Sequence, residues 1–194
     1  MSVHTKNTRE RLIEAAKRVF SEKGYFETHI SHIIEEAGTA RGTFYIYFNS
    51  KEEIFREILN QVVYELRRRI KRIDNGRNPV EQIIRNIERV FEFALEEKEL
   101  AKIILYRGYD NQFSNIVNEF FDEIREMVKT SLEKGILMGY LKPVNTEVVA
   151  QAIVGAVKEV TGNLIEKNNA DKYMIAKELV EFALGGLWDV KGRD

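Results

Sequence analysis

The chain has 194 residues, 44% hydrophobic and 31% charged and without cysteine, which allows a packed core but excludes disulfides, thiol catalysis and thiolate metal sites. The N-terminus has no apolar signal segment and no stretch approaches the ~18 uncharged apolar residues of a membrane span, so we expect a cytoplasmic protein without membrane contact. Residues 1–72 hold 14 Lys/Arg and 10 Asp/Glu (net +4) and residues 73–194 hold 16 and 21 (net −5), a distribution that suits a small DNA-binding module joined to a larger one.

Hydrophobic residues recur at helical spacing along the chain, without a strand-like alternation, so we predict an all-α fold of about nine helices. The first helix has its apolar stripe over residues 12–20 and is closed by Gly24. The second covers residues 30–37 and ends at Gly38, and the third covers roughly residues 40–47. Two such short helices joined at a glycine form the helix-turn-helix pattern, in which the later helix enters the DNA major groove.

The remaining helices are marked by capping residues. Ser50 and Glu53 form a capping box that begins a long fourth helix, expected over residues 51–73. Turn-forming residues at 74–78 mark the clearest break after it, and Asn78 is placed to cap the next helix. We expect further helices near residues 79–97, 99–107, 112–138, 146–168 and 171–188.

Four dense motifs in the N-terminal third carry a family resemblance. They are Gly24-Tyr-Phe-Glu-Thr28, Ile33-Ile-Glu-Glu-Ala-Gly38, Gly42-Thr-Phe-Tyr-Ile-Tyr-Phe48 and Ser50-Lys-Glu-Glu-Ile-Phe55. Over residues 8–59 the chain closely resembles the TetR family of transcriptional regulators. The resemblance implies a helix-turn-helix DNA-binding domain at residues 1–50 and a ligand-binding and dimerisation domain at residues 51–194, with the fourth helix (51–73) as connector.

The resemblance also assigns DNA contacts. Thr28 and Ser31, at the start of the second helix, match positions that touch phosphate, where free amides favour an anion. Lys51 matches a phosphate-binding lysine, and Tyr45 and Tyr47 match positions that pack on the DNA backbone and donate hydroxyls to phosphates. Arg41 is the expected base-contacting residue, because its forked donors match guanine. Two alternatives remain open: Arg41 is only a solvated charge, and Tyr45 and Tyr47 serve only for aromatic packing. Ile46 departs from the family pattern, since many relatives carry His or Tyr at this position. The expected DNA-binding set is Thr28, Ser31, Thr39, Ala40, Arg41, Gly42, Thr43, Tyr45, Tyr47 and Lys51.

Two charged motifs have competing interpretations. His29 and His32 have a spacing that could present two imidazoles to a metal, but they fall in the helix expected to contact phosphate, so we expect no metal. The basic run of residues 67–72 lies roughly 24 Å along the helix from Lys51, at 1.5 Å per residue. We interpret it as a solvated face, and contact with an acidic part of a ligand or with the other domain remains open.

Residues 79–121 are rich in aromatic side chains, which at helical spacing also suit a core. Relatives use this region to enclose a small-molecule pocket, which implies a lipophilic effector such as a fatty acyl compound, a drug or an aromatic. The expected ligand-binding residues are Phe91, Leu95, Tyr106, Tyr109, Phe113, Val117, Phe121 and Ile153.

The last two helices combine small and bulky apolar residues on more than one side. In the family these helices pair with those of a second subunit in a four-helix bundle, and a purely internal core is the alternative. The expected dimerisation residues are Val149, Ile153, Ala156, Val160, Leu179, Phe182, Ala183, Gly186 and Leu187.

The expected function is therefore a ligand-responsive transcriptional regulator: a repressor that binds a pseudo-palindromic operator as a homodimer and is released by its effector. An enzyme is not expected, because the chain has no Cys, no Gly-rich phosphate loop and only three His, all at or before His32. For the same reasons we expect no cofactor. A ligand-binding or interaction protein without DNA regulation is the alternative, and repression against activation stays open.

Overall fold

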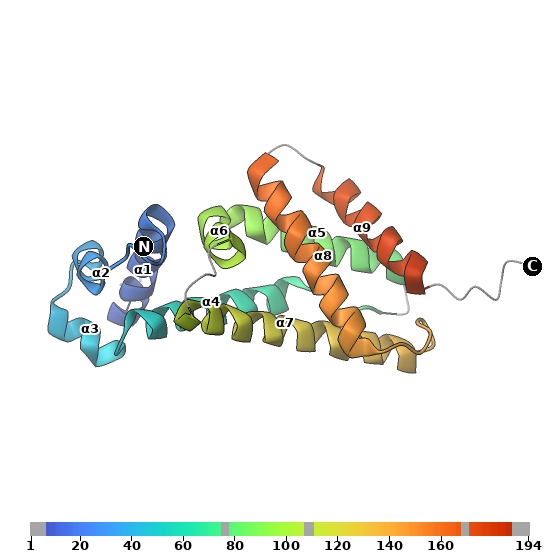
Figure 1. The fold of residues 1–194 in the computed structure, drawn as a ribbon, viewed down its shortest axis with the longest axis horizontal. Helices are drawn as coiled ribbons and strands as arrows, with labels where there is room; N and C mark the ends of the chain where they lie inside the picture. Colours follow the sequence, from blue (N-terminus) through green and yellow to red (C-terminus); the bar gives the residue numbers. More distant parts are fainter. Residues whose placement is uncertain (1–6, 75–77, 107–110, 168–170, 188–194) are drawn as a thin grey trace, which may run out of the picture. The chain divides into compact units, whose positions relative to one another are not determined.

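The computed structural model describes residues 7–74, 78–106, 111–167 and 171–187, and every regular element within these ranges is an α-helix, as predicted (Figure 1). The ends agree with the predicted ones to within about two residues, except at the end of the fourth helix. The helices are α1 (Thr8–Lys23), α2 (Ile30–Ala37), α3 (Arg41–Tyr47), α4 (Lys51–Arg69), α5 (Pro79–Glu96), α6 (Lys98–Tyr106), α7 (Asn111–Leu137), α8 (Thr146–Lys167) and α9 (Lys172–Leu187).

Helix α4 ends at Arg69, four residues before the predicted end at Ile73. Beyond it, two side-chain amides of α5 hold the backbone. Asn86 accepts from the Lys71 N–H and donates to its carbonyl, both at 2.8 Å. Gln82 accepts from the Asp74 N–H at 3.1 Å and donates to its carbonyl at 2.9 Å. These amide clamps give the extended segment the hydrogen bonds that another helical turn would have supplied.

The helices group into two compact units, each formed from two stretches of the chain. Unit 1 comprises residues 1–64 and 97–117, and unit 2 comprises residues 65–96 and 118–194. This division differs from the predicted boundary at residue 50, because the first half of α4 contributes to the core of unit 1. The Phe55 ring, for example, lies 5.3 Å from that of Phe20 and 4.9 Å from that of Tyr25. Helix α6 also packs on α1 within this unit.

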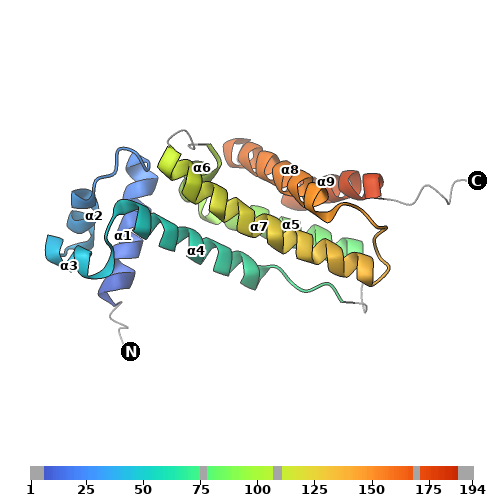
Figure 2. The same ribbon diagram turned by 60° about the horizontal axis from the view of Figure 1, so that its bottom comes forward.

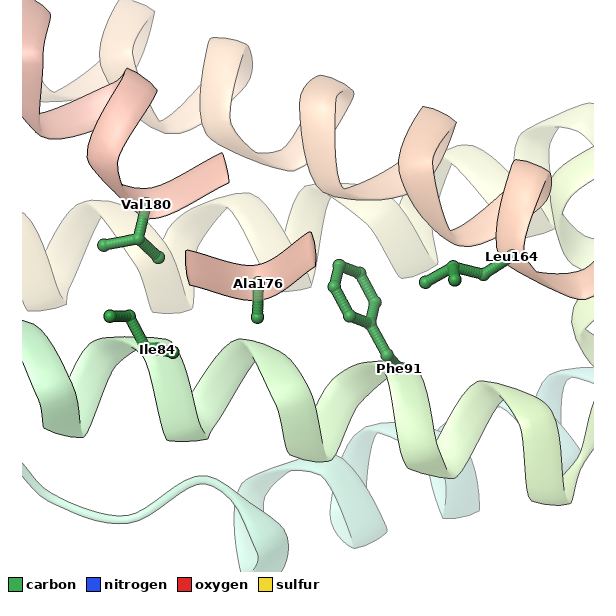
Figure 3. Close-up of a cluster of buried hydrophobic side chains, with 5 residues drawn as sticks. All are labelled: Ile84, Phe91, Leu164, Ala176 and Val180. Carbon is green, nitrogen blue, oxygen red and sulfur yellow. The ribbon is translucent and has the colours of Figure 1, made fainter. Parts of the chain in front are cut away.

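The core of unit 2 is built where α5, α8 and α9 lie side by side (Figure 1). Figure 3 shows the Phe91 side chain extending from α5 toward Leu164 and Ala176. Its ring is fully buried. Around it, Tyr173 of α9 donates a 3.0 Å hydrogen bond to Glu81 of α5, which ties the two helices together at their starts. The buried cluster is Ile84, Phe91, Leu164, Ala176 and Val180.

Helix α8 differs from the expectation that no segment is apolar enough to cross a membrane. By length and composition alone it could do so, with only Lys158 and Glu159 as charges in its apolar middle. Length and composition are weak evidence, since core helices of many folded domains meet the same criterion. A third of that window is buried within the fold. Much of this apolar helix is therefore not buried in the single chain, and its exposed apolar residues, such as Val148 and Ala152, lie beside the expected dimerisation residues.

Candidate nucleic-acid interface

The helices α1 to α3 and the start of α4 surround one small core (Figure 2). Phe44 of α3 is fully buried and lies 6.0 Å from Phe48, the residue that follows the helix. Ile33 of α2 is also fully buried, so one side chain from each short helix fixes its orientation. The remaining side chains of α3 are thereby directed toward its surface.

The turn between α2 and α3 is held by backbone geometry and by one arginine. Gly38 has φ +59°, a left-handed conformation that favours glycine, and its N–H donates to Glu35. Arg11 of α1 donates from Nη2 to the Ala37 carbonyl at 2.6 Å and therefore satisfies the end of α2. Local sequence reasoning missed Arg11, because its contact lies 26 residues away in the chain.

At the start of α2 the structure assigns Thr28 a position that differs from the expected phosphate contact. Its side chain is fully buried, and its hydroxyl donates to the Gly24 carbonyl at 2.7 Å. The hydroxyl thus stabilises the turn from α1 into α2 and does not face solvent. Ser31, one helical turn further, is exposed and keeps the expected accessibility.

His29 and His32, beside this turn, form a hydrogen bond with each other. The His29 backbone N–H donates to Nδ1 of His32 at 3.2 Å, which satisfies one of the free amides at the start of α2. Nδ1 of His32 therefore acts as an acceptor. Among the described residues, no group of three or more His, Cys, Asp or Glu side chains could hold a metal ion.

Helix α3 presents most of the expected DNA-contacting residues at the surface. The Arg41 guanidinium lies 5.9 Å from the centre of the Tyr45 ring, and both side chains are exposed. Tyr47 is exposed on the same helix, whereas Thr43 is half-buried. Before the helix, Ala40 is exposed and the buried hydroxyl oxygen of Thr39 has no hydrogen-bond partner in the described structure. Ile46 is exposed too, although the sequence analysis assigned it no contact.

The start of α4 is tied to the turn before α2 by Lys51. Its ammonium donates to the Tyr25 carbonyl at 2.9 Å and lies 4.5 Å from the centre of the Tyr25 ring. The Tyr25 hydroxyl in turn donates to Glu52 at 3.1 Å. Burial alone would raise the pKa of Glu52, but hydrogen bonds from its own backbone, Ser50 and Tyr25, with the Lys51 charge, lower that pKa below its ordinary value.

The predicted capping box is present with one change. Ser50 Oγ accepts from the Glu53 N–H at 3.2 Å, as expected. The Glu53 carboxylate reaches back to the N–H of Asn49 at 2.7 Å and to its side-chain amide at 2.9 Å. The box therefore fixes Asn49 and the chain leaving α3 as well as the start of α4.

The basic run at the end of α4 is largely paired within unit 2. Arg67 donates to Glu123 of α7 at 2.7 Å. Arg69 forms a two-pronged pair with Glu96 at 3.0 and 2.6 Å and lies 4.6 Å from the Phe93 ring. The hydrogen bond from Arg69 lowers the pKa of Glu96. These contacts support the interpretation of a structural, solvated face.

The expected ligand-binding residues are divided between the two units. Phe91 belongs to the core cluster of unit 2, which favours the packing alternative for this ring. Val117 is buried in unit 1. In unit 2, Leu95, Phe121 and Ile153 are half-buried, and the Lys158 ammonium lies 4.9 Å from the Phe121 ring. Tyr109 and the side chains of Tyr106 and Phe113 lie outside the described residues.

The expected dimerisation residues lie beside an exposed apolar face. On α8 the outward stripe is Val148, Ala152 and Gly155, at i, i+4 and i+7, opposite the buried Ala150 and Val154. On α9, Phe182 is 81% exposed. The predicted dimerisation residues of α8 are half-buried and lie beside this stripe. One of them, Val160, and the predicted α9 residue Leu179 pack against the buried cluster of unit 2. Those half-buried in the single chain are Val149, Ile153, Ala156 and Ala183, while the side chains of Gly186 and Leu187 lie outside the described residues.

Two short helices, α2 and α3, are joined by a left-handed glycine turn, and α3 exposes most of its side chains. This arrangement defines a helix-turn-helix DNA-binding domain. Comparison with known proteins agrees, since residues 12–58 match the family model described as bacterial regulatory proteins, tetR family. Residues 12–58 therefore form a DNA-binding domain of the kind found in this family of transcriptional regulators.

Similarity extends well beyond that domain. The chain is 28% identical to an uncharacterized HTH-type transcriptional regulator, YdgC, of Bacillus subtilis, over 96% of this chain and 95% of the relative. It is 26% identical to the fatty acid metabolism regulator protein of B. subtilis, over 91% and 93% of the two chains. The solved structure of the fatty acid degradation regulator FadR from Bacillus halodurans superposes with a TM-score of 0.76 at 26% identity, covering 95% and 98%.

Proposed function

We propose that this chain is a cytoplasmic repressor that binds a pseudo-palindromic operator as a homodimer and is released by a fatty acyl effector. The observation that carries the proposal is the surface of α3. There Arg41, Tyr45 and Tyr47 are exposed on a short helix anchored by the buried Phe44, within the segment that matches a family of regulators.

The DNA contacts divide into two kinds. The Arg41 guanidinium is the base-contacting group, since its parallel donors fit the O6 and N7 acceptors of guanine. Tyr45, Tyr47, Ser31 and Lys51 bind phosphates; the hydroxyls are neutral donors and the ammonium adds charge. Lys51 also donates to the Tyr25 carbonyl in the turn before α2. In this proposal its ammonium therefore both holds the DNA-binding domain in position and contacts a DNA phosphate. Thr28 has only the positioning role in this proposal.

Dimerisation is supported by the exposed apolar side chains of α8 and α9. Phe182 is 81% exposed and Val148 58% exposed in the single chain, and the small Ala152 and Gly155 beside Val148 allow another helix to approach closely. Exposed patches of this kind mark interaction sites in folded proteins. A second copy of the same two helices covers the face symmetrically. A dimer of helix-turn-helix domains binds half-sites about 34–36 Å apart, so we expect that spacing in the operator.

The effector class is supported by two relatives. Two proteins about one quarter identical to this chain over nearly full length are named for fatty acid metabolism and fatty acid degradation. An acyl chain suits the aromatic-rich region of residues 79–121, which we expect to enclose the effector. Release follows from linkage: a compound that binds the free regulator more tightly than the DNA-bound one lowers DNA affinity by the same factor. Since α6 packs on α1, a change in α6 is transmitted directly to the DNA-binding domain.

The experiment has two parts. Sequences bound by the full chain are selected from a random duplex pool, which reports the operator, its symmetry and its spacing together. Affinity for the selected operator is then measured by fluorescence anisotropy with palmitoyl-CoA, palmitate or coenzyme A added. We expect a two-fold symmetric operator, steep salt dependence, and weaker binding with an acyl compound but not with coenzyme A alone.

Opposite results would contradict separate parts of the proposal. Failure to select any sequence contradicts DNA regulation. A single, asymmetric half-site contradicts the dimer. Operator binding that is unaffected by both acyl compounds contradicts the effector class and leaves the DNA-binding proposal intact.

A further inference from the structure

The outer face of α3 has an unusual composition. Phe44 marks the buried side of the helix. At 100° per residue the opposite side is occupied by Gly42 and Ile46, which stand at i and i+4 and so share one face. We call these two residues the outer face of α3. The polar and aromatic residues Arg41, Tyr45 and Tyr47 stand on either side of it.

Ile46 is the most prominent side chain of this face. The Ile46 residue is 76% exposed, and its aliphatic side chain has no polar atom that could hydrogen-bond to water. One turn earlier, a Cβ atom added to Gly42 would meet nothing within 4 Å, so nothing in the chain itself requires glycine there. The glycine instead leaves bare backbone beside Ile46, which allows an external partner to approach closely.

Single exposed apolar residues are common and need no explanation by themselves. Here the residue occupies the centre of the surface proposed to enter the major groove. On either side of it stand Arg41, proposed to contact a base, and Tyr45 and Tyr47, proposed to bind phosphates. The major groove offers one apolar group, the C5 methyl of thymine. An isoleucine beside a glycine matches that methyl in both chemistry and shape.

We propose that Ile46 is a specificity-determining residue that contacts a thymine methyl in each half of the operator. The inference rests on the proposed DNA-binding function and adds the base pair that an apolar side chain selects. Discrimination by Ile46 depends on one methyl group. It should therefore respond to the loss of that methyl even when every hydrogen-bonding group of the base pair is kept.

The test replaces each thymine of the selected operator in turn by deoxyuridine, which lacks only the C5 methyl. Wild-type affinity should fall at one position by about fourfold for each half-site, the value expected for one buried methyl-sized group. Ile46→Ala should bind the unmodified operator more weakly and should bind the thymine and deoxyuridine versions equally. Because Ile46 is exposed and alanine favours helix, the variant should keep the wild-type circular dichroism spectrum.

Leu137→Ala is the matched control, since Leu137 is an 87% exposed aliphatic residue of α7 in unit 2. It should retain the full difference between thymine and deoxyuridine. The inference is overturned if no deoxyuridine weakens wild-type binding, or if Ile46→Ala keeps the discrimination. Failure of wild type to bind any duplex would instead overturn the proposed function, and this inference with it.

Discussion

Thr28→Val tests whether the Thr28 hydroxyl stabilises the fold or binds DNA. Valine keeps the shape of the side chain and removes its hydrogen bond to the Gly24 carbonyl, made at 2.7 Å in a fully buried site. A neutral hydrogen bond contributes about 1 kcal/mol, and a buried acceptor left without its donor costs about 1–3 kcal/mol. We therefore expect the free energy of unfolding to fall by about 1–2 kcal/mol. For a chain of this size that lowers the Tm by about 2–8 °C.

The measurement is urea unfolding of the full chain at one protein concentration, followed by circular dichroism, together with operator affinity at a temperature where both proteins are folded. The affinity of Thr28→Val should stay within about twofold of wild type. Ser31→Ala is the control with the opposite expectation, since Ser31 is exposed: unchanged stability and weaker DNA binding. A Thr28→Val protein of wild-type stability with strongly reduced affinity would refute the buried role.

Three further predictions concern other parts of the molecule. Glu52 has a lowered pKa, so its contribution to stability is present above the ordinary value of 4.5 and is lost as the pH falls through the folded pKa. Glu52→Gln should be less stable than wild type at pH 7 by less than about 1 kcal/mol, and the difference between the two urea midpoints should shrink as the pH falls below 4.5. Phe182→Glu should give a folded monomer by light scattering at micromolar concentration, because a carboxylate in an apolar interface is unpaired; an unchanged dimer would contradict the proposed face. Arg11→Met should lower the free energy of unfolding by about 1 kcal/mol and weaken operator binding, because the Ala37 carbonyl loses its donor. Arg18→Met breaks only an exposed ion pair, so it should change the free energy of unfolding and the operator affinity little. Equal effects of the two variants would argue against the capping role of Arg11.

The ends of most helices could be predicted because their signals are local. Ser50 accepts from the Glu53 N–H at 3.2 Å at the start of α4, and Asn78 accepts from the Val80 N–H at 2.9 Å at the start of α5. Gly24 and Gly38 have positive φ values where α1 and α2 end. Each of these caps involves residues within a few positions of one another, so the sequence pattern contains all that is needed.

The end of α4 and the role of Thr28 could not be predicted in the same way. The backbone of Lys71 and Asp74 is held by side chains 15 and 8 residues further along, and only the folded chain brings them together. A family motif can mark Thr28 as important, but the motif does not tell whether the hydroxyl faces inward or outward. The sequence analysis noted Ile46 only as a departure from the family pattern, because an exposed aliphatic residue is usually without consequence. Its spacing from Gly42 was the available signal for the contact that we propose.

The paired amide clamps after α4 have a consequence for building chimeric regulators. The composition of residues 74–78 suggests a natural junction for grafting a foreign DNA-binding domain. However, Asn86 and Gln82 each grip both backbone groups of one residue in the preceding segment, and an insertion or deletion between Lys71 and Asp74 would put at least one clamp out of register. A graft should therefore take residues 70–74 and α5 from the same parent.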